Sequence, residues 1–271
     1  MQFTLTLGRG FLMRYFAQPY TSAKQLIGIL LFLLGSFAAC NTYAQTEIVV
    51  TRGDGNWPPF EMIQDGKLTG FHIDLIRAVA EEANIHVVFK TYPWLRAVQM
   101  AKTGRSDAVS YLAKNEERQE FIVFSDNNVL SGTDHYLIKC KDRTDISFDG
   151  DYKSIESFSL VHIDGYTFGD DFDKVLFVQK AGVKNAEEVV ELVAKGRYDI
   201  GIVSPADLGG AEASELIDKI EFLEPVLYST TVYIGFSKAG ENRHAYAAFT
   251  QAMKEFKKSN RYQQLRFKYG L

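Results

Sequence analysis

The sequence predicts an α/β protein built from two related units, one inserted into the other. Strand-like and helix-like segments alternate after residue 45, which indicates parallel sheets with helices packed against them. One short pattern occurs twice, 92 positions apart: "KTGRSDAVS" (102–110) and "AKGRYDIGI" (194–202) both place Gly-Arg-x-Asp between a helical stripe and an apolar run. Two extended stretches rich in aromatic and β-branched residues, 133–141 and 224–238, flank the second copy. We therefore expect two crossings between the units.

The first unit is expected to contain three strands and two helices. The segment 71–85 places its apolar residues on one helical stripe, namely Ile73, Ile76, Val79, Ala80 and Ala83. A second helix begins at Pro93 and stops at Gly104, in keeping with the preference for proline at helix starts and glycine after helix ends. The expected strands are 46–53, 86–92 and 106–112.

The second unit repeats this scheme, and two more helices follow it. Its expected segments are a strand at 158–164, the start of a helix in 166–173, a strand at 174–180, a helix at 185–196 and a strand at 198–204. The closing helices are 243–259 and 260–270. In both copies of the repeat, the glycine ends a helix in the left-handed conformation and the aspartate starts the next strand.

The first 44 residues differ from the rest and are typical of a secretory signal. They contain Arg9, Arg14 and Lys24 but no acidic residue, followed by the short apolar run 26–39. This run is short for a membrane-spanning helix. We expect cleavage after Ala44 and a periplasmic location. Lipid attachment at Cys40 is the alternative, and Met13 is an alternative start.

The composition of the remaining chain excludes several classes of function. Without the signal it carries 27 basic and 34 acidic residues, a net charge near −7, which gives no reason to expect a nucleic-acid partner. Cys140 would be its only cysteine, so no internal disulfide is possible. The histidines show no metal-ligand spacing, and there is neither a phosphate loop nor a nucleophile elbow. We expect a monomer without metal or cofactor.

Three motifs resemble the family 3 extracellular solute-binding proteins, the periplasmic receptors of ABC importers for histidine, glutamine and arginine. They are "WPPF" (57–60), "GFHIDL" (70–75) and the Glu-Arg…Phe-Ser run at 117–125, and the resemblance extends over the chain after residue 45. It implies the type II periplasmic-binding-protein fold, two α/β lobes joined by two crossing strands with a ligand cleft between them. The implied boundaries are 1–44 for the signal peptide, 45–136 and 230–271 for lobe 1, and 137–229 for lobe 2.

The resemblance also implies a set of ligand-binding residues in lobe 1. Trp57 and Trp94 would line the pocket, Ser110 and Tyr111 would offer hydroxyl and backbone donors, and Arg118 would clamp a ligand carboxylate. The chemistry agrees, because a guanidinium matches a carboxylate with two parallel charge-assisted bonds, and tryptophans offer rigid apolar faces. The alternatives are a packed turn residue for Trp57 and a solvated ion pair for Arg118.

Lobe 2 would supply Thr167 and the amide of Tyr166 to the same carboxylate, but it departs from the family pattern elsewhere. Ser204 stands where amino-acid binders usually carry an aspartate for the ligand ammonium, and Asp207 is nearby but out of register. A serine cannot offset a desolvated ammonium as a carboxylate does. The family's threonine ahead of the arginine is replaced by Asn115. Both an amino acid and a related organic acid therefore stay open as ligands.

The expected function is capture of a small carboxylate-bearing solute for an ABC importer, without enzymatic activity. An alternative is a dehydratase acting on cyclic carboxylic acids, for which Glu61, Asp164 or Asp207 would be the acid, although none has a recognisable catalytic spacing. Another is a sensor or partner-interaction protein with the same fold. Arg96, close to Trp94 in sequence, faces either the cleft or the solvent.

Overall fold

The computed structural model describes residues 45–208 and 215–271. The predicted signal sequence, with Met13 and Cys40, lies outside these residues. Within the described ranges, no helix has both the length and the apolar character needed to cross a membrane. Residues 45–271 form one compact unit.

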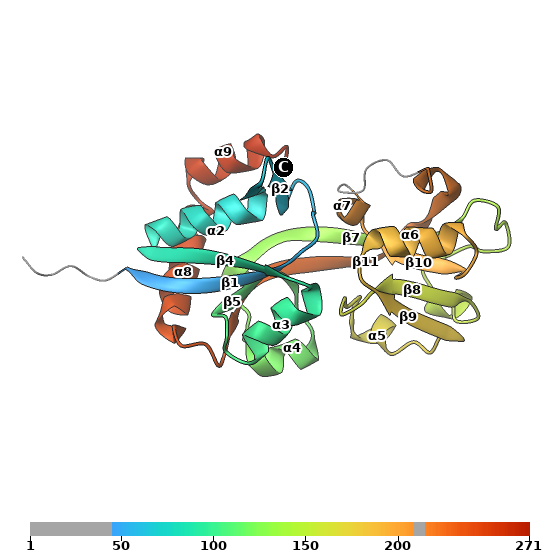
Figure 1. Ribbon diagram of the computed structural model, residues 1–271, viewed down its shortest axis with the longest axis horizontal. Helices are drawn as coiled ribbons and strands as arrows, with labels where there is room; N and C mark the ends of the chain where they lie inside the picture. The colour runs from blue at the N-terminus through green and yellow to red at the C-terminus, as the bar shows by residue number, and fades with distance from the viewer. Residues whose placement is uncertain (1–44, 209–214) are drawn as a thin grey trace, which may run out of the picture. The chain divides into compact units, whose positions relative to one another are not determined.

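Two long antiparallel strands lie in the middle of the fold and connect its two halves (Figure 1). They are β7 (Val129–Cys140) and β11 (Ile220–Ser237), within a nine-stranded sheet of order β4-β1-β5-β11-β7-β10-β8-β9, with β6 also paired to β11. The two extended stretches predicted as crossings are therefore confirmed, and both strands begin earlier than expected. Their pairing brings Thr133 opposite Thr230 and His135 opposite Tyr228.

We call the half that contains both chain ends of the described region lobe 1. Its strands are β1 (Thr46–Gly53), β2 (Met62–Gln64), β3 (Lys67–Thr69), β4 (Ile85–Tyr92), β5 (Ala108–Ala113) and β6 (Ile122–Val123). Its helices are α2 (Phe71–Glu82), α3 (Trp94–Lys102), α4 (Glu116–Phe121), α8 (Arg243–Phe256) and α9 (Asn260–Lys268), with the short 3-10 helix η1 (Asp126–Asn128). Strand β1 pairs in parallel with both β4 and β5, as the alternation of strands and helices predicts.

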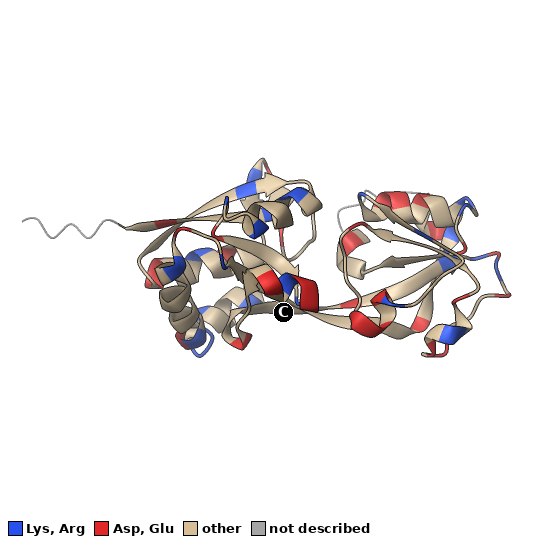
Figure 2. Cartoon of the chain, turned by 90° about the horizontal axis from the view of Figure 1, so that it is seen from below, with Lys and Arg blue, Asp and Glu red and all other residues tan. Residues whose placement is uncertain are grey.

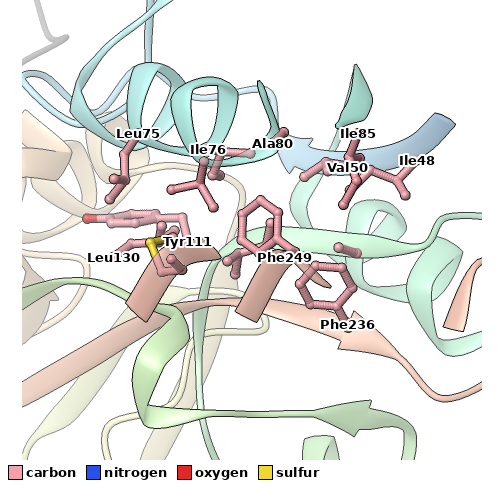
Figure 3. Packing of buried hydrophobic residues seen from close by; sticks show 14 of the residues in the cluster. Ile48, Val50, Leu75, Ile76, Ala80, Ile85, Tyr111, Leu130, Phe236 and Phe249 are labelled. Carbon is pink, nitrogen blue, oxygen red and sulfur yellow. The ribbon is translucent and has the colours of Figure 1, made fainter. Parts of the chain in front are cut away.

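The core of lobe 1 forms where α2 and α8 cover this sheet. Leu75 and Ile76 of α2 pack with Val50 of β1 and Phe249 of α8 in one buried cluster (Figure 3). Tyr111 lies at one end of the cluster, with its hydroxyl pointing away from the other labelled side chains. The core of lobe 1 thus supports one residue of the predicted ligand site directly.

We call the other half lobe 2. It contains β8 (Ser159–Ile163), β9 (Gln179–Val183), β10 (Ile200–Val203), α5 (Asp170–Asp173), α6 (Ala186–Ala194) and α7 (Pro205–Leu208), with the 3-10 helices η2 (Tyr152–Ser154) and η3 (Ile217–Lys219). Strand β8 pairs in parallel with β9 and β10. Gly201 lets α6 pack closely on β10, since a Cβ there would lie 2.6 Å from Val189 Cγ1. Acidic and basic residues are interspersed over both lobes (Figure 2).

The repeated Gly-Arg-x-Asp pattern has the same structural role in both lobes. Gly104 and Gly196 follow helices with left-handed φ values of 73° and 66°. The aspartates then tie the end of the helix–strand turn to the first strand of each lobe. Asp107 accepts the amide of Val49 at 2.8 Å, and Asp199 accepts the amide of Ser159 at 2.9 Å. The pattern thus marks one supersecondary unit built twice.

The fold class is confirmed, whereas two segments of lobe 2 differ from expectation. The helix expected from Tyr166 begins only at Asp170, because Gly165 and Gly169 adopt φ values of 74° and 93° that interrupt helical geometry. The strand expected at 174–180 is wrong in its extent, since β9 begins at Gln179. Leu176 and Val178 are 88% and 72% exposed, so this apolar run is not a buried strand. The implied lobe boundaries, after 136 and after 229, fall inside β7 and β11.

Candidate ligand-binding site

Two adjoining cavities lie between the lobes and share Trp94 and Tyr166 as walls. The small cavity, of about 30 Å³, is lined by Trp94, Tyr111, Ala113, Arg118, Thr133, His135, Tyr166, Thr167, Thr230 and Val232. The large cavity, of about 400 Å³, is lined by Asp54, Gly55, Asn56, Trp57, Trp94, Ile163, Tyr166, Lys184, Asn185, Ala186, Glu187 and Asp207. All of the predicted ligand-binding residues except Ser110 and Ser204 line one or both cavities.

Trp57 reaches the large cavity from a tight turn after β1. The carbonyl of Trp57 accepts the amides of Phe60 and Glu61 at 2.7 and 2.9 Å, which fixes the turn. Its indole packs directly over two glycines, since a Cβ on Gly53 or Gly55 would lie 2.5 or 2.7 Å from the ring. Any larger residue at these positions would displace the indole. The packed-turn and pocket-wall interpretations of Trp57 therefore apply together.

A buried ionic cluster beneath this turn holds it in place. Arg52, Glu61 and His72 are all fully buried. Arg52 Nε donates to Glu61 Oε2 at 3.1 Å, and its Nη2 donates to the Gly55 carbonyl at 2.5 Å. His72 Nδ1 lies 3.6 Å from Glu61 Oε1, while Nε2 lies 2.8 Å from Ser131 Oγ. The Arg52 guanidinium also lies 5.5 Å from the Trp57 ring centre.

The ionisation of this cluster bears on the dehydratase hypothesis. Burial by itself raises the pKa of the Glu61 carboxyl, but His72 and Arg52 together lower it below its ordinary value. A catalytic acid needs the opposite shift. On His72 burial acts in the other direction. It lowers the pKa of the imidazole, and the Glu61 carboxylate only partly offsets this effect. Glu61 is thus an ionised structural partner of Arg52, and Asp164 is exposed.

Tyr111 enters the small cavity because β5 is irregular at this point. The β5–β11 register shifts between Tyr233 and Gly235, and Tyr111 has a left-handed φ of 56°, rare for a bulky residue. Its ring lies 5.3 Å from that of Trp57, and its hydroxyl lies 3.3 Å from Thr133 Oγ1 on β7. Burial raises the pKa of the Tyr111 hydroxyl, and so does nearby Asp207. This side chain is therefore a neutral hydrogen-bonding group.

The side chain of Ser110, the residue before Tyr111 on β5, does not enter the small cavity. It is fully buried, lines neither cavity, and its hydroxyl has no hydrogen-bond partner among the described residues. The structure thus places it away from both cavity surfaces, and it is among the groups that lower the pKa of the Glu61 carboxyl.

Arg118 projects from α4 into the small cavity and is 6% exposed. Asn115 caps this helix by accepting the Arg118 amide at 2.8 Å, so the residue that replaces the family's threonine keeps a helix-start role. The guanidinium donates to the carbonyls of Ala113 at 2.7 Å and Gly165 at 2.6 Å. No carboxylate of the described residues forms an ion pair with it. Burial lowers the pKa of Arg118 to about 10, which leaves it charged at neutral pH.

Trp94 joins the lobes at the same point. Its Nε1–H donates to the Gly165 carbonyl of lobe 2 at 3.1 Å, and the Arg118 guanidinium lies 5.8 Å from its ring centre. Gly165 has a φ of 74°, and a Cβ there would lie 2.3 Å from Leu95 Cδ2. Arg96, in contrast, is exposed and stacks 5.1 Å from the ring centre of Tyr92, so it faces the solvent.

The lobe 2 donors expected from the loop before α5 have protein partners in this structure. The Tyr166 amide donates to Ile163 at 3.2 Å, and the Thr167 hydroxyl donates to Asp173. The Tyr166 hydroxyl donates to Asp207 Oδ1 at 3.3 Å. Burial raises the pKa of Tyr166, as does the charge of Asp207. Its ring separates the small cavity from the large one.

Ser204 and Asp207 cap the start of α7 reciprocally. Asp207 Oδ2 accepts the Ser204 amide and hydroxyl, both at 2.8 Å, and Ser204 Oγ accepts the Asp207 amide at 3.2 Å. This arrangement brings the Asp207 carboxylate back to the end of β10. Asp207 is 5% exposed, lines the large cavity and forms no ion pair with a described cation. From the sequence, Asp207 was out of register with the position at which amino-acid binders carry their aspartate.

Sequence reasoning also missed Thr133, His135 and Thr230 on the crossing strands. The residues Thr133 and His135 are two positions apart on β7, so both project from the same face, and both line the small cavity. The sequence around them reads Ser-Gly-Thr-Asp-His (131–135), so no alternation of polar and apolar residues marked these positions.

Comparison with known proteins gives the family. The model of the bacterial extracellular solute-binding proteins, family 3, matches residues 49–271. The probable amino-acid-binding protein YxeM of Bacillus subtilis is 26% identical over 136 residues, 48% of this chain and 51% of that protein. The probable histidine-binding protein of Campylobacter jejuni is 29% identical over 101 residues, 37% of this chain and 40% of that protein. The chain thus spans about half the length, or less, of these curated relatives.

A solved structure supports the fold assignment. An ancestral arginine-binding protein bound to glutamine matches with a TM-score of 0.68 at 21% identity, covering 84% of this chain and 99% of that one. At this identity the likeness is one of fold, and the relatives named here are binding proteins rather than enzymes. Because the family match covers most of the sequence, this chain belongs to the family 3 bacterial extracellular solute-binding proteins.

Proposed function

We propose that this protein captures an amino acid in the cleft between its lobes. The observation that carries the proposal is a pair of buried, opposite charges, neither of which forms an ion pair among the described residues. Arg118 lines the small cavity and Asp207 lines the large one, and neither forms an ion pair within the described part of the chain. Unpaired buried charges are costly, so a bound zwitterion that neutralises both is the occupant with matching chemistry.

The walls between these charges suit the rest of an amino acid. Trp57, Trp94 and Tyr166 offer aromatic faces at the junction of the two cavities. In the proposal, Arg118 holds the carboxylate and Asp207 holds the ammonium, taking the role for which Ser204 lacks a charge. The polar residues of the large cavity, which include Lys184 and Glu187, would then contact the side chain of the amino acid.

We further propose delivery of this amino acid to an ABC importer in the inner membrane, after export to the periplasm by the signal sequence at residues 1–44. Membership of an extracellular solute-binding family supports both steps. Loss of saturable uptake of the bound amino acid on deletion of the gene, with restoration by the intact gene, would test delivery. Unchanged uptake would contradict it.

A binding screen tests the function itself. The purified protein is heated with common amino acids, dicarboxylates, aromatic acids and amines, because a compound that binds only the folded state raises the melting temperature by mass action. We expect an amino acid to give the largest shift. A response confined to acids without an ammonium would contradict the zwitterion proposal.

Two variants then test the assigned charges by calorimetry. We expect Arg118→Ala to weaken binding of the responding amino acid by at least about tenfold, or about 1.4 kcal/mol. Arg96→Ala is the matched control, since Arg96 is exposed on the neighbouring helix, and binding should be unchanged. Asp207→Asn should weaken binding of the amino acid but not of its deamino analogue. Equal affinity of Arg118→Ala and the wild type would refute the clamp.

A further inference from the structure

Two buried polar atoms of residues that line the small cavity have no hydrogen-bond partner among the described residues. They are Nδ1 of His135 on β7 and Oγ1 of Thr230 on β11. Both side chains belong to residues that are 5% exposed and line this cavity. Since buried polar groups in folded proteins are nearly always paired, these two atoms indicate a polar occupant.

The charge of the cavity indicates which kind of polar group this occupant carries. Arg118 is the one charged side chain among the described residues that line it, and no carboxylate does. The guanidinium has more N–H groups than the two that it uses with Ala113 and Gly165. Thr230 can turn its hydroxyl hydrogen inward, and His135 donates from Nδ1 in one of its neutral tautomers. The cavity therefore offers donors and a positive charge to a hydrogen-bond acceptor.

The size of the cavity restricts the acceptor. About 30 Å³ accommodates roughly two water molecules, which is close to the space that a planar carboxylate needs. A tetrahedral phosphonate or sulfonate is larger than this space. The remainder of a ligand would reach the large cavity beside Trp94 and Tyr166, the two walls that the cavities share.

We propose that His135 and Thr230 donate hydrogen bonds to the ligand carboxylate beside Arg118, so that the two crossing strands form half of the carboxylate site. The inference rests on the proposed function and adds the residues that select a carboxylate over larger acid groups. In this proposal, residues of the two strands that connect the lobes contact the ligand directly. Their pairing holds Thr133, His135 and Thr230 around one point.

The surroundings of His135 give this contact a dependence on pH. Tyr166 and Phe168 pack their rings at 6.1 and 5.2 Å from it, and Arg118 and Tyr111 line the same cavity. Burial lowers the pKa of His135, and the nearby carboxylates of Asp207 and Asp134 only partly offset this. A bound carboxylate adds a negative charge and raises that pKa. Binding is therefore expected to take up a proton and to strengthen as pH falls.

Acetate is the probe, since it carries the head group alone. In the wild-type protein we expect acetate to shift the ring-nitrogen NMR signals of His135 saturably, while methylphosphonate does not. Thr230→Val, which removes only the hydroxyl, should weaken acetate binding by about tenfold, and Thr230→Ser should restore it. Thr231→Val is the matched control, because Thr231 is the next residue of β11 and its side chain projects from the opposite face of the strand. His135→Asn should keep a donor but abolish the strengthening of acetate binding at lower pH.

Two results would overturn the proposal. Acetate could leave the His135 signals unmoved, which would mean that water alone fills the cavity. Alternatively, Thr230→Val could bind acetate as the wild type does, which would mean that Thr230 does not contact the carboxylate. If the variants do not fold, the wild-type NMR titration decides by itself. Amino-acid binding without these effects would leave the proposed function standing. Acetate binding without any amino-acid response would overturn that function and leave the carboxylate site.

Discussion

At the scale of single residues, Tyr111 shows most clearly how the site departs from relaxed geometry. A non-glycine residue with φ of 56° is uncommon, and the left-handed conformation costs an L-residue about 1–2 kcal/mol. Here the strained backbone places a tyrosine between the core of lobe 1 and the small cavity. Strain of this kind persists only where the surrounding structure fixes it, and it gathers at functional sites.

This strain predicts an unusual order of stability. Tyr111→Gly and Tyr111→Ala lose nearly the same side chain, but glycine adopts positive φ without strain. We expect the glycine variant to be more stable than the alanine variant by about 1 kcal/mol in urea unfolding. At Ala113, which has no positive φ, glycine should instead destabilise by about 0.5–1 kcal/mol. Greater stability of the alanine variant at 111 would contradict the strain.

At the scale of secondary-structure elements, the short helix α4 positions the guanidinium. Its first turn depends on Asn115, whose side chain accepts the amide of Arg118 itself. The carbonyl of Ala113 then holds the guanidinium at the end of β5. The position of the charge in the cavity thus follows from one cap and one strand end.

Removing this cap should affect both stability and binding. We expect Asn115→Ala to lower the free energy of unfolding by about 1 kcal/mol and to weaken amino-acid binding as Arg118 loses its fixed position. Asn115→Asp should retain both properties, because aspartate caps equally well. Ser259→Ala removes the cap of α9, which lines neither cavity, and should reduce stability alone. Unchanged amino-acid binding in Asn115→Ala would contradict the claim that this cap positions Arg118 for binding. Urea unfolding and calorimetry measure the two quantities.

At the scale of the whole molecule, Gly165 marks a close approach between the lobes. Its carbonyl accepts hydrogen bonds from Trp94 and Arg118, both in lobe 1. A Cβ at this position would lie 2.3 Å from Leu95 Cδ2. A side chain at position 165 would therefore fit this contact only if Leu95, which is 52% exposed, moved aside.

Gly165→Ala should hold the lobes apart. We expect a larger radius of gyration in small-angle X-ray scattering with the amino acid present, and about tenfold weaker binding. Gly196→Ala is the matched control, because Gly196 has a similar φ of 66° but a Cβ added there would meet no atom of the described residues within 4 Å. Adding Leu95→Ala to Gly165→Ala should restore part of the affinity. Equal scattering curves for Gly165→Ala and the wild type would refute the closure argument.

Much of the fold follows from local sequence signals. Strand and helix alternation, the helix stops at Gly104 and Gly196, and the two crossing stretches agree with the structure because each depends on neighbouring residues. Two segments of lobe 2 are exceptions. The helix expected from Tyr166 begins later, because Gly165 and Gly169 interrupt it. The run containing Leu176 and Val178 is exposed, since an apolar run alone does not say whether a strand is buried. The aromatic and arginine positions that line the cavities came from the resemblance to the family, whose motifs lie within single segments.

The rest of the site depended on how distant segments meet. Asp207 reaches the large cavity because its carboxylate turns back to cap α7 at Ser204. His135 and Thr230 face one cavity because the register of β7 against β11 sets the direction of their side chains. The sequence by itself determined most of the strands and helices and the family to which the chain belongs. Only the tertiary structure decided which side chains converge, because register, capping and the approach of the two lobes are properties of residues far apart in the chain.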